Sequence, residues 1–153
     1  MRPAEEFRYL VLAAQREGNR LLGQALKPLG LTTSQAEVIR ILHDRQPLTL
    51  TGLGELLVCE SGTSPSRLVD RLVAAGLIQR TAAEHDRRHI ELRLTDRGDD
   101  LAQQVIQIEE QLYRSIDALA EDTGLDQINT FLRAFVGDLP AGQALARRIA
   151  TTR

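Results

Sequence analysis

The chain has few of the residues that mark several large protein classes. Of its 153 residues, one is cysteine, none is tryptophan and 3% are aromatic. The single cysteine, Cys59, excludes an internal disulfide and favours a reducing compartment. The core must therefore be built from leucine, isoleucine, valine and alanine. Cys59 itself is expected to be a small buried filler of that core rather than a redox sensor.

Long apolar runs are also missing. No stretch approaches the ~20 continuous apolar residues of a membrane-spanning helix, and residues 1–6 do not contain the apolar region of a signal peptide. These absences predict a soluble, cytoplasmic protein without a membrane partner. The sequence also has no nucleophile elbow, glycine-rich phosphate loop or zinc-protease motif, so neither catalysis nor a cofactor is expected.

Lysine is nearly absent, since Lys27 is the only one among the 19 basic residues. The net charge is −2, which taken alone argues against a nucleic-acid partner. The distribution of charge matters more than its sum. Residues 60–97 carry seven arginines and six acidic residues, whereas residues 98–153 carry five arginines and nine acidic residues. The middle of the chain can therefore present a basic face if its arginines point one way.

Apolar residues recur at three- and four-residue steps over much of the chain and predict amphipathic helices. A long first helix is expected over residues 4–26. A capping box, formed by Thr32 with Gln35 or by Ser34 with Glu37, begins a second helix that ends before Pro47.

Two shorter helices follow the second. The third is expected over residues 49–57, although its two glycines weaken it. After a turn that starts at residue 60, Ser64 and Pro65 predict the N-cap and the first position of a fourth helix, which stops at Gly76.

The pattern then changes to strict alternation of apolar and polar residues. Ile90, Leu92 and Leu94 predict the buried face of a strand, and residues 78–81 predict its partner. A polar tip at residues 82–89 joins the two strands as a projecting hairpin. Two further helices are expected, from Thr95–Asp96 through Leu119 and over residues 128–136, and residues 144–150 can add a short terminal helix beyond them.

The predicted order is α-α-α-α-β-β-α-α, a mainly α fold with a small β-hairpin wing. This order is typical of a winged helix-turn-helix, which places the start of its second helix in the major groove of DNA. Thr63, Ser64 and Ser66 offer hydroxyls to phosphate oxygens there. Arg67 can reach a guanine edge or a phosphate, and Arg71 lies one helical turn further along.

The hairpin tip predicts a second contact with DNA. Arg87 and Arg88 can enter the minor groove, whose negative potential favours arginine. Asp86 can accept hydrogen bonds from the Arg88 side chain and fix its orientation. No metal site is expected from His85, Asp86 and His89, because these residues share a hairpin tip rather than one helical face.

Several motifs resemble the MarR family of winged helix-turn-helix transcriptional regulators. They are SRLVDRL at residues 66–72, GLIQR at 76–80, Asp86-x-Arg88 on the wing, and LRLTDRG at 92–98. The resemblance covers essentially the whole chain. It implies that Arg88 is the minor-groove arginine, held by Asp86, and that Ser64, Ser66 and Arg67 contact DNA.

The resemblance also implies three functional parts and a mode of action. Residues 1–30 and 98–153 would form the dimerisation helices, and residues 31–97 the DNA-binding lobe. The homodimer would bind an inverted-repeat operator, with repression favoured over activation. A small aromatic or phenolic ligand between the dimer helices and the lobe would modulate it. The near-neutral charge leaves an alternative, a ligand-sensing or protein-interaction dimer whose winged helix no longer reads DNA.

Overall fold

The computed structural model describes residues 1–59 and 62–150. The chain forms α1 (Pro3–Leu26), the 3-10 helix η1 (Lys27–Leu29), α2 (Thr33–Arg45), α3 (Leu50–Gly54), α4 (Pro65–Ala74), β1 (Ile78–Ala82), β2 (Ile90–Leu94), α5 (Asp96–Ala120), α6 (Leu125–Val136) and α7 (Pro140–Ala150). The predicted order is confirmed, and the terminal helix α7 begins four residues earlier than expected.

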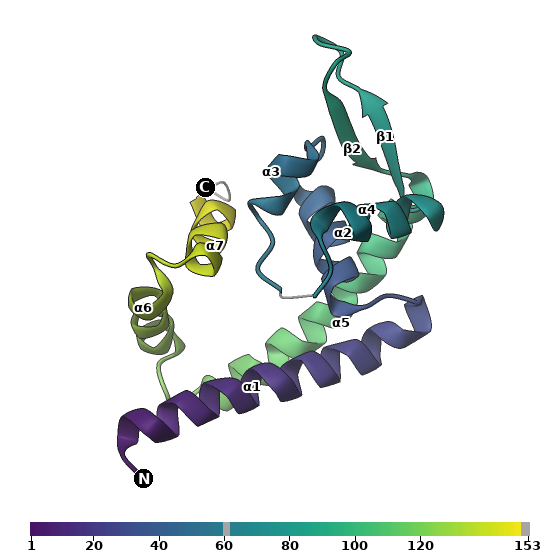
Figure 1. Ribbon diagram of the computed structural model, residues 1–153. Helices are drawn as coiled ribbons and strands as arrows, with labels where there is room; N and C mark the ends of the chain where they lie inside the picture. Colours follow the sequence, from purple (N-terminus) through teal and green to yellow (C-terminus); the bar gives the residue numbers. More distant parts are fainter. Residues whose placement is uncertain (60–61, 151–153) are drawn as a thin grey trace.

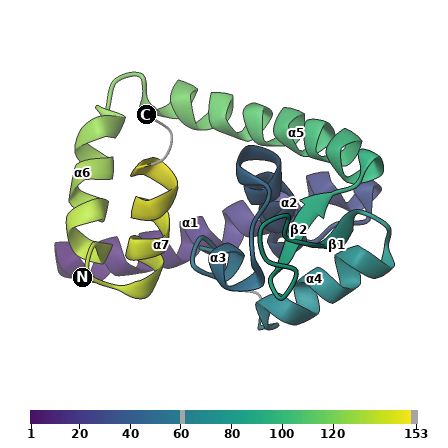
Figure 2. The same cartoon turned by 90° about the horizontal axis from the view of Figure 1, so that it is seen from above.

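The elements separate into a lobe and a set of long helices (Figure 1). α1 and α5 pack against each other along the base of the molecule. The helices α2, α3 and α4 and the hairpin β1–β2 form the lobe at one end, from which the hairpin projects. α6 lies at the other end, beside the N-terminal part of α1, and α7 lies between α6 and the lobe (Figure 2). Neither α1 nor α5, the two longest described helices, is apolar enough to cross a membrane.

Local capping fixes where the lobe helices begin. The Gln35 backbone N–H donates to Oγ1 of Thr32 at 3.2 Å, and the Thr32 backbone N–H donates to Oε1 of Gln35 at 3.0 Å. Of the two capping boxes that the sequence allows, the structure therefore adopts Thr32 with Gln35. Ser64 caps α4, with Pro65 at its first position, as predicted.

The core lies in the lobe and at the lobe end of α5. Its fully buried side chains come from the end of α1, from α2, α3 and α4, from the hairpin and from α5, and include Leu26, Ile39, Leu42, Leu53, Val69, Leu72, Ile78, Leu92 and Val105. In contrast, α6 has no buried residue. The hydrophobic effect thus holds the lobe together, and much of the apolar surface of the other helices stays outside the core.

Two expectations about the lobe are wrong in detail. α3 ends at Gly54, so Leu56 and Leu57 follow the helix instead of lying on it. The glycines in this segment lower its helical propensity, which accounts for the short helix. Ile90 is 48% exposed although its neighbours at alternate positions, Leu92 and Leu94, are buried. It lies at the tip end of β2, where the hairpin extends beyond the core that covers the other two.

The motif after the wing binds the start of α5 to the end of α4. Oγ1 of Thr95 accepts the backbone N–H of Gly98 at 3.1 Å and donates to the backbone oxygen of Gly76 at 2.6 Å. A Cβ atom on Gly98 would lie 2.0 Å from the backbone oxygen of Leu77. Glycine at this position therefore allows α5 to start directly against the turn that leads from α4 into β1.

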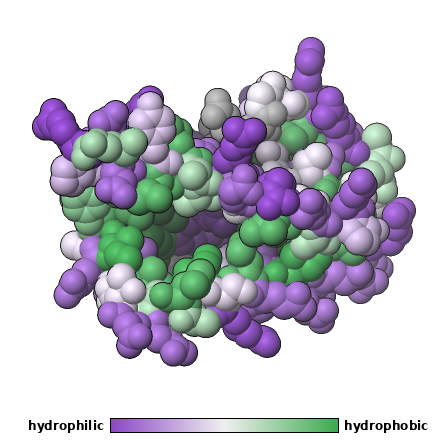
Figure 3. Space-filling view, turned by 90° about the horizontal axis from the view of Figure 1, so that it is seen from below, coloured by the Kyte–Doolittle hydropathy of each residue, from purple (hydrophilic) through white to green (hydrophobic). Residues whose placement is uncertain are grey.

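Apolar side chains remain exposed along the helices outside the lobe. They include Tyr9, Leu10, Val11 and Leu12 of α1, Ile116 and Leu119 of α5, Ile128, Phe131 and Phe135 of α6, and Leu145 and Ile149 of α7. In the view from below, hydrophobic residues gather around a hollow (Figure 3). Phe7 of α1 packs edge-on against Phe131 of α6, with ring centroids 5.1 Å apart.

Candidate nucleic-acid interface

The first turn of α4 presents hydroxyls and a cation on one surface. Oγ of Ser64 accepts the Arg67 backbone N–H at 3.4 Å and lies 3.1 Å from Oγ of Ser66. Ser64, Ser66 and Arg67 are exposed, and Thr63 is half-buried. The first two residues of the predicted turn, 60 and 61, lie outside the described residues. The start of α4 thus has both a side-chain cap and backbone N–H groups, which suit an anion such as phosphate.

The amphipathic pattern of α4 sets which side chains face outward. Leu68, Val69 and Leu72 are buried against the lobe, as predicted from their spacing. Arg67 and Arg71, one turn apart, are exposed on the other side of the helix. Their positions follow from helical geometry, because residues four apart share a face.

The wing is anchored to the lobe by backbone hydrogen bonds. β1 and β2 pair antiparallel, with Ile78 opposite Leu94 and Ala82 opposite Ile90. Leu48, in the link between α2 and α3, forms a bridge with Leu92 through hydrogen bonds of 2.7 and 3.2 Å. These bonds hold the base of the wing while its tip projects from the lobe.

At the wing tip, Asp86 contacts the backbone of Arg88 instead of its guanidinium. Oδ1 of Asp86 accepts the Arg88 backbone N–H at 3.0 Å, and Oδ2 lies 3.4 Å from Nε2 of His89. The expected hydrogen bond to the Arg88 side chain is not among the contacts of the described residues. Asp86 therefore shapes the turn, and the guanidinium projects from it. No group of three or more His, Cys, Asp or Glu in the described ranges could hold a metal ion.

The arginines of the lobe fall into two groups. Arg80 pairs with Asp70, Arg93 lies 3.6 Å from Glu91, and Arg97 donates to the backbone oxygen of Ala75 at 3.3 Å. The side chains of Arg67, Arg71, Arg87 and Arg88 are exposed and have no ion pair or hydrogen bond within residues 1–59 and 62–150. The unpaired arginines are those predicted to contact DNA, and they lie along α4 and at the wing tip.

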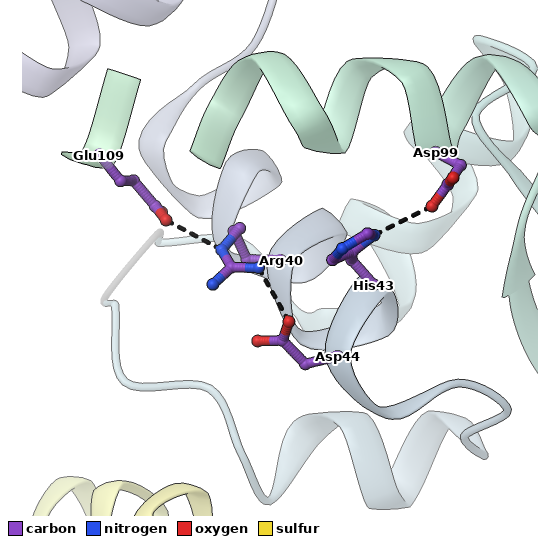
Figure 4. A network of polar contacts seen from close by, with 5 residues as sticks. All are labelled: Arg40, His43, Asp44, Asp99 and Glu109. Carbon is purple, nitrogen blue, oxygen red and sulfur yellow. Dashed lines mark hydrogen bonds and ion pairs between the residues drawn. The ribbon is translucent and has the colours of Figure 1, made fainter. Parts of the chain in front are cut away.

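A polar network joins the lobe to α5 (Figure 4). Nε of Arg40 donates to Glu109 at 2.9 Å, and Nη1 of the same side chain donates to Asp44 at 2.9 Å. Nδ1 of His43 lies 2.9 Å from a carboxylate oxygen of Asp99. Burial raises the pKa of Glu109 above its ordinary value, and the Arg40 guanidinium partly offsets this rise. The network fixes α2 against α5 along its exposed side.

The sequence reasoning missed a buried carboxylate behind the start of α4. Glu37, on α2, accepts the backbone N–H groups of Val58 and Cys59, each at 2.9 Å, and a hydrogen bond from Arg148 at 2.8 Å. The one sequence signal for this role is that Glu37 is an acid at a helical position where an apolar residue is expected. Its partners come from a loop and from the terminal helix.

Cys59 is exposed, which contradicts its expected role as a buried filler. It follows α3 in an irregular segment that leaves the core, so the position is not on the buried face of a helix. Protein atoms around the thiol displace water and raise its pKa to about 12, and the Glu37 carboxylate adds to the rise. Such a thiol contains little thiolate at neutral pH.

A cavity of about 520 Å³ lies between α2, the segment after α3, and α7. Its lining combines arginines, acids and aliphatic side chains, among them Arg40, Arg45, Arg148, Glu37, Asp44, Ile41, Leu145 and Ile149. This combination suits a ligand with an apolar body and a polar group.

Comparison with known proteins supports a family assignment. The family model described as MarR family matches residues 31–90. The organic hydroperoxide resistance transcriptional regulator of Bacillus subtilis is 30% identical over 100 residues, which are 65% of this chain and 67% of that protein. The HTH-type transcriptional regulator SarZ of Staphylococcus epidermidis is 30% identical over 98 residues, which cover 66% of its length, slightly less than two thirds.

Solved structures match over a larger share of the chain. The fold resembles a mutant MarR from Escherichia coli complexed with operator DNA, with a TM-score of 0.69 and 25% identity over 88% of this chain and 94% of that one. For the apo form of wild-type MarR from the same bacterium the TM-score is 0.61, with 26% identity over 86% and 96% of the two chains. The fold is therefore closer to the operator-bound structure.

Proposed function

The chain belongs to the MarR family of DNA-binding transcriptional regulators, and from that premise we propose that it represses transcription by binding an inverted-repeat operator as a homodimer. A small, phenolic ligand then modulates its binding. Each protomer offers α4 to the major groove and the tip of the wing to the minor groove. The two recognition helices of the dimer read half-sites about one helical turn apart.

The set of unpaired arginines carries this proposal. Arg67 and Arg71 on α4, and Arg87 and Arg88 on the wing, have no acidic partner within the described residues although acids neutralise or occupy other arginines of the lobe. An exposed, unpaired guanidinium is available for bidentate contact with phosphate or guanine. Ser64 and Ser66 add hydroxyls beside Arg67. The overall charge of −2 does not oppose this role, because the acidic excess lies after residue 98.

The exposed apolar residues of α1 and α5 to α7 support the homodimer. Phe131 and Phe135 are 56% and 63% exposed, and Leu119 is 84% exposed. Contiguous apolar surface of this kind marks interaction sites in soluble proteins. Its location agrees with dimerisation by residues 1–30 and 98–153, with residues 31–97 as the DNA-binding lobe.

The cavity beside α2 and α7 supports a small-molecule ligand. A phenol ring can lie against Ile41, Leu145 and Ile149, and its hydroxyl can reach polar groups of the lining, where acids pair with Arg40 and Arg148. A ligand held between the terminal helices and the lobe would change their relative position. It could then shift the population that is able to bind DNA.

Footprinting of the purified chain on the DNA flanking its own reading frame tests the function. We expect protection of two half-sites related by inverted symmetry. The affinity for that operator should fall steeply with salt, because four unpaired arginines per protomer would give a slope of log K against log[salt] between roughly −4 and −7 for the dimer. Undetectable binding, or a flat salt dependence, would favour a ligand-sensing or protein-interaction dimer that does not read DNA.

The dimer and the ligand are tested separately. Sedimentation should give a dimer for the wild-type chain, and Phe131→Asp should shift it toward a monomer because the charge enters an apolar contact. A monomeric wild-type chain would contradict the proposed geometry. Addition of hydroxybenzoate during footprinting should reduce protection at the operator. Unchanged protection across a series of substituted phenols would reject a phenolic effector.

A further inference from the structure

Glu37 joins three segments of the chain that are distant in sequence. Its side chain is 6% exposed. One carboxylate oxygen accepts the Val58 backbone N–H at 2.9 Å and Nη1 of Arg148 at 2.8 Å, and the other accepts the Cys59 backbone N–H at 2.9 Å. A buried carboxylate is costly unless it is paired and hydrogen-bonded, and these contacts compensate its burial.

The two backbone N–H groups belong to the segment that enters α4. α3 ends at Gly54, α4 begins at Pro65, and Val58 and Cys59 lie between them. A single carboxylate that binds two consecutive amides fixes the path of the backbone at that point. Because Glu37 is part of α2, within the core of the lobe, this segment is held relative to the helix against which α4 packs.

The last turn of α7 contacts the lobe through hydrogen bonds in both directions. From α7, Arg148 donates to Glu37, and Arg147 donates to the backbone oxygen of Glu55 at 3.3 Å. From α2, Arg45 donates to the backbone oxygens of Arg147 and Arg148. A guanidinium suits this position, since the carbonyls at a helix C-terminus lack helical partners and carry partial negative charge. α7 lies on the side of the lobe where α3 ends (Figure 2).

We propose that Glu37 and Arg148 form a positioning pair that couples the terminal helix α7 to the recognition helix α4. With α7 docked, Arg148 holds the Glu37 carboxylate against the two amides, and α4 keeps the orientation that reads the operator. When α7 moves away from α2, Glu37 loses this cationic partner and its hold on the backbone at Val58 and Cys59 weakens. The inference rests on the proposed operator binding and adds the route by which movement of the terminal helices reaches the DNA-facing surface.

The direction of the coupling follows from the conformation of the chain. With α7 docked, Glu37 fixes the backbone at Val58 and Cys59. The docked state is assigned the higher operator affinity, because a recognition helix already held in one orientation loses less freedom on binding. Loss of the positioning pair should weaken specific binding, whereas contacts with phosphates, which come from other arginines, should persist.

Hydrogen exchange and operator binding of the full chain test the pair together. Arg148→Ala should speed amide exchange at Val58 and Cys59 and weaken operator binding about tenfold. Binding to random DNA and the salt slope should stay unchanged, because no phosphate contact is removed. Arg148→Lys retains the charge and should restore most of the affinity. Glu37→Gln, which is isosteric, should reproduce the effect of Arg148→Ala if the latter variant is poorly folded.

The matched control is Arg133→Ala on α6. Arg133 is exposed and donates to Thr130 on its own helix, so its loss should not alter exchange at residues 58–59. Operator affinity should also stay unchanged, with sedimentation showing that the variant forms the same dimer as the wild-type chain. Unchanged exchange in Arg148→Ala overturns the proposal, and so does faster exchange with unchanged operator affinity. The exchange measurement needs no DNA. If the wild-type chain binds no operator, the proposed function fails, while faster exchange still supports the link between α7 and the segment before α4.

Discussion

Asp70 on α4 forms an ion pair with Arg80 on β1, so a charged contact joins the recognition helix directly to the base of the wing. β1 in turn pairs with β2 along its whole length. The start of α4 and the tip of the wing are thus parts of one connected unit. The pair also occupies Arg80, which leaves Arg67 and Arg71 on α4 and the arginines of the wing tip available to a ligand.

Arg88→Ala should weaken operator binding and reduce its salt dependence. The guanidinium at the wing tip is exposed, and Asp86 contacts the backbone N–H of Arg88 rather than its side chain. Truncation should therefore leave the fold and the thermal stability unchanged. In a dimer, loss of two cations that displace counterions from the minor groove should lower the magnitude of the salt slope by roughly 2, which fluorescence anisotropy over a salt series would measure.

Arg114→Ala is a matched control for this experiment. Arg114 is an exposed arginine on α5, outside the lobe, so its removal changes the net charge equally without touching the proposed interface. Its salt slope should equal that of the wild-type chain. A slope for Arg88→Ala that equals the control would remove the wing tip from the DNA interface.

Ser64→Ala should lower the free energy of unfolding by about 1 kcal/mol, because it removes the N-cap of α4. Ser66→Ala lies within the first turn of the same helix and should change stability by less than about 0.5 kcal/mol. Urea denaturation of both variants would measure the difference. If both variants lost the same free energy of unfolding, the Ser64 hydroxyl would stabilise α4 no more than the Ser66 hydroxyl does. That result would contradict a stabilising N-cap.

The parts of the fold that the sequence predicts are those that depend on neighbouring residues. Thr32, Ser64 and Thr95 each cap a helix through a hydrogen bond from a backbone N–H three residues later. The alternation that predicts β2 is likewise local. Hydrogen bonds of this range are encoded by residue type and spacing alone, so their positions can be read before the tertiary structure is known.

The parts that the sequence does not predict depend on chain segments far apart. Glu37 meets Val58 across 21 positions and Arg148 across 111. No periodicity brings these groups together, since their contact depends on how α7 returns to the lobe. Cys59 illustrates the same limit. A small apolar side chain at the end of an apolar helix predicts burial, whereas the path of the chain after α3 leaves Cys59 exposed.

Gly98→Ala should destabilise the protein by about 1 to 3 kcal/mol, because the added Cβ would overpack a close contact. That atom would lie 2.0 Å from the backbone oxygen of Leu77, and a backbone atom cannot move aside as a flexible side chain can. Gly18→Ala is the matched control. Gly18 lies within α1, and a Cβ atom added there would meet no other atom within 4 Å. Alanine at this position should therefore add about 0.5 to 1 kcal/mol of stability through its higher helix propensity.

Thermal and chemical denaturation of both glycine variants would measure these opposite changes. The contrast tests whether the glycine of the motif after the wing serves the packing of α5 against the end of α4. A Gly98→Ala variant as stable as the wild-type chain would show that the two elements can separate by about 1 Å without cost, which contradicts the tight contact.

The Cys59 thiol should react slowly with iodoacetamide despite its exposure. Its pKa is raised to about 12 by the surrounding protein and then by Glu37. Because the thiolate is the reactive form, alkylation at pH 8 should be at least about tenfold slower than that of a free cysteine, and it should accelerate as the pH rises toward the thiol pKa. Glu37→Gln removes the nearby negative charge, so it should lower the thiol pKa and speed the reaction. The chain unfolded in urea should react at the ordinary rate. Rapid alkylation of the folded wild-type chain at pH 8 would contradict the raised pKa and restore a redox role for Cys59. Slow alkylation would mean that an oxidant reaching this surface finds little reactive thiolate.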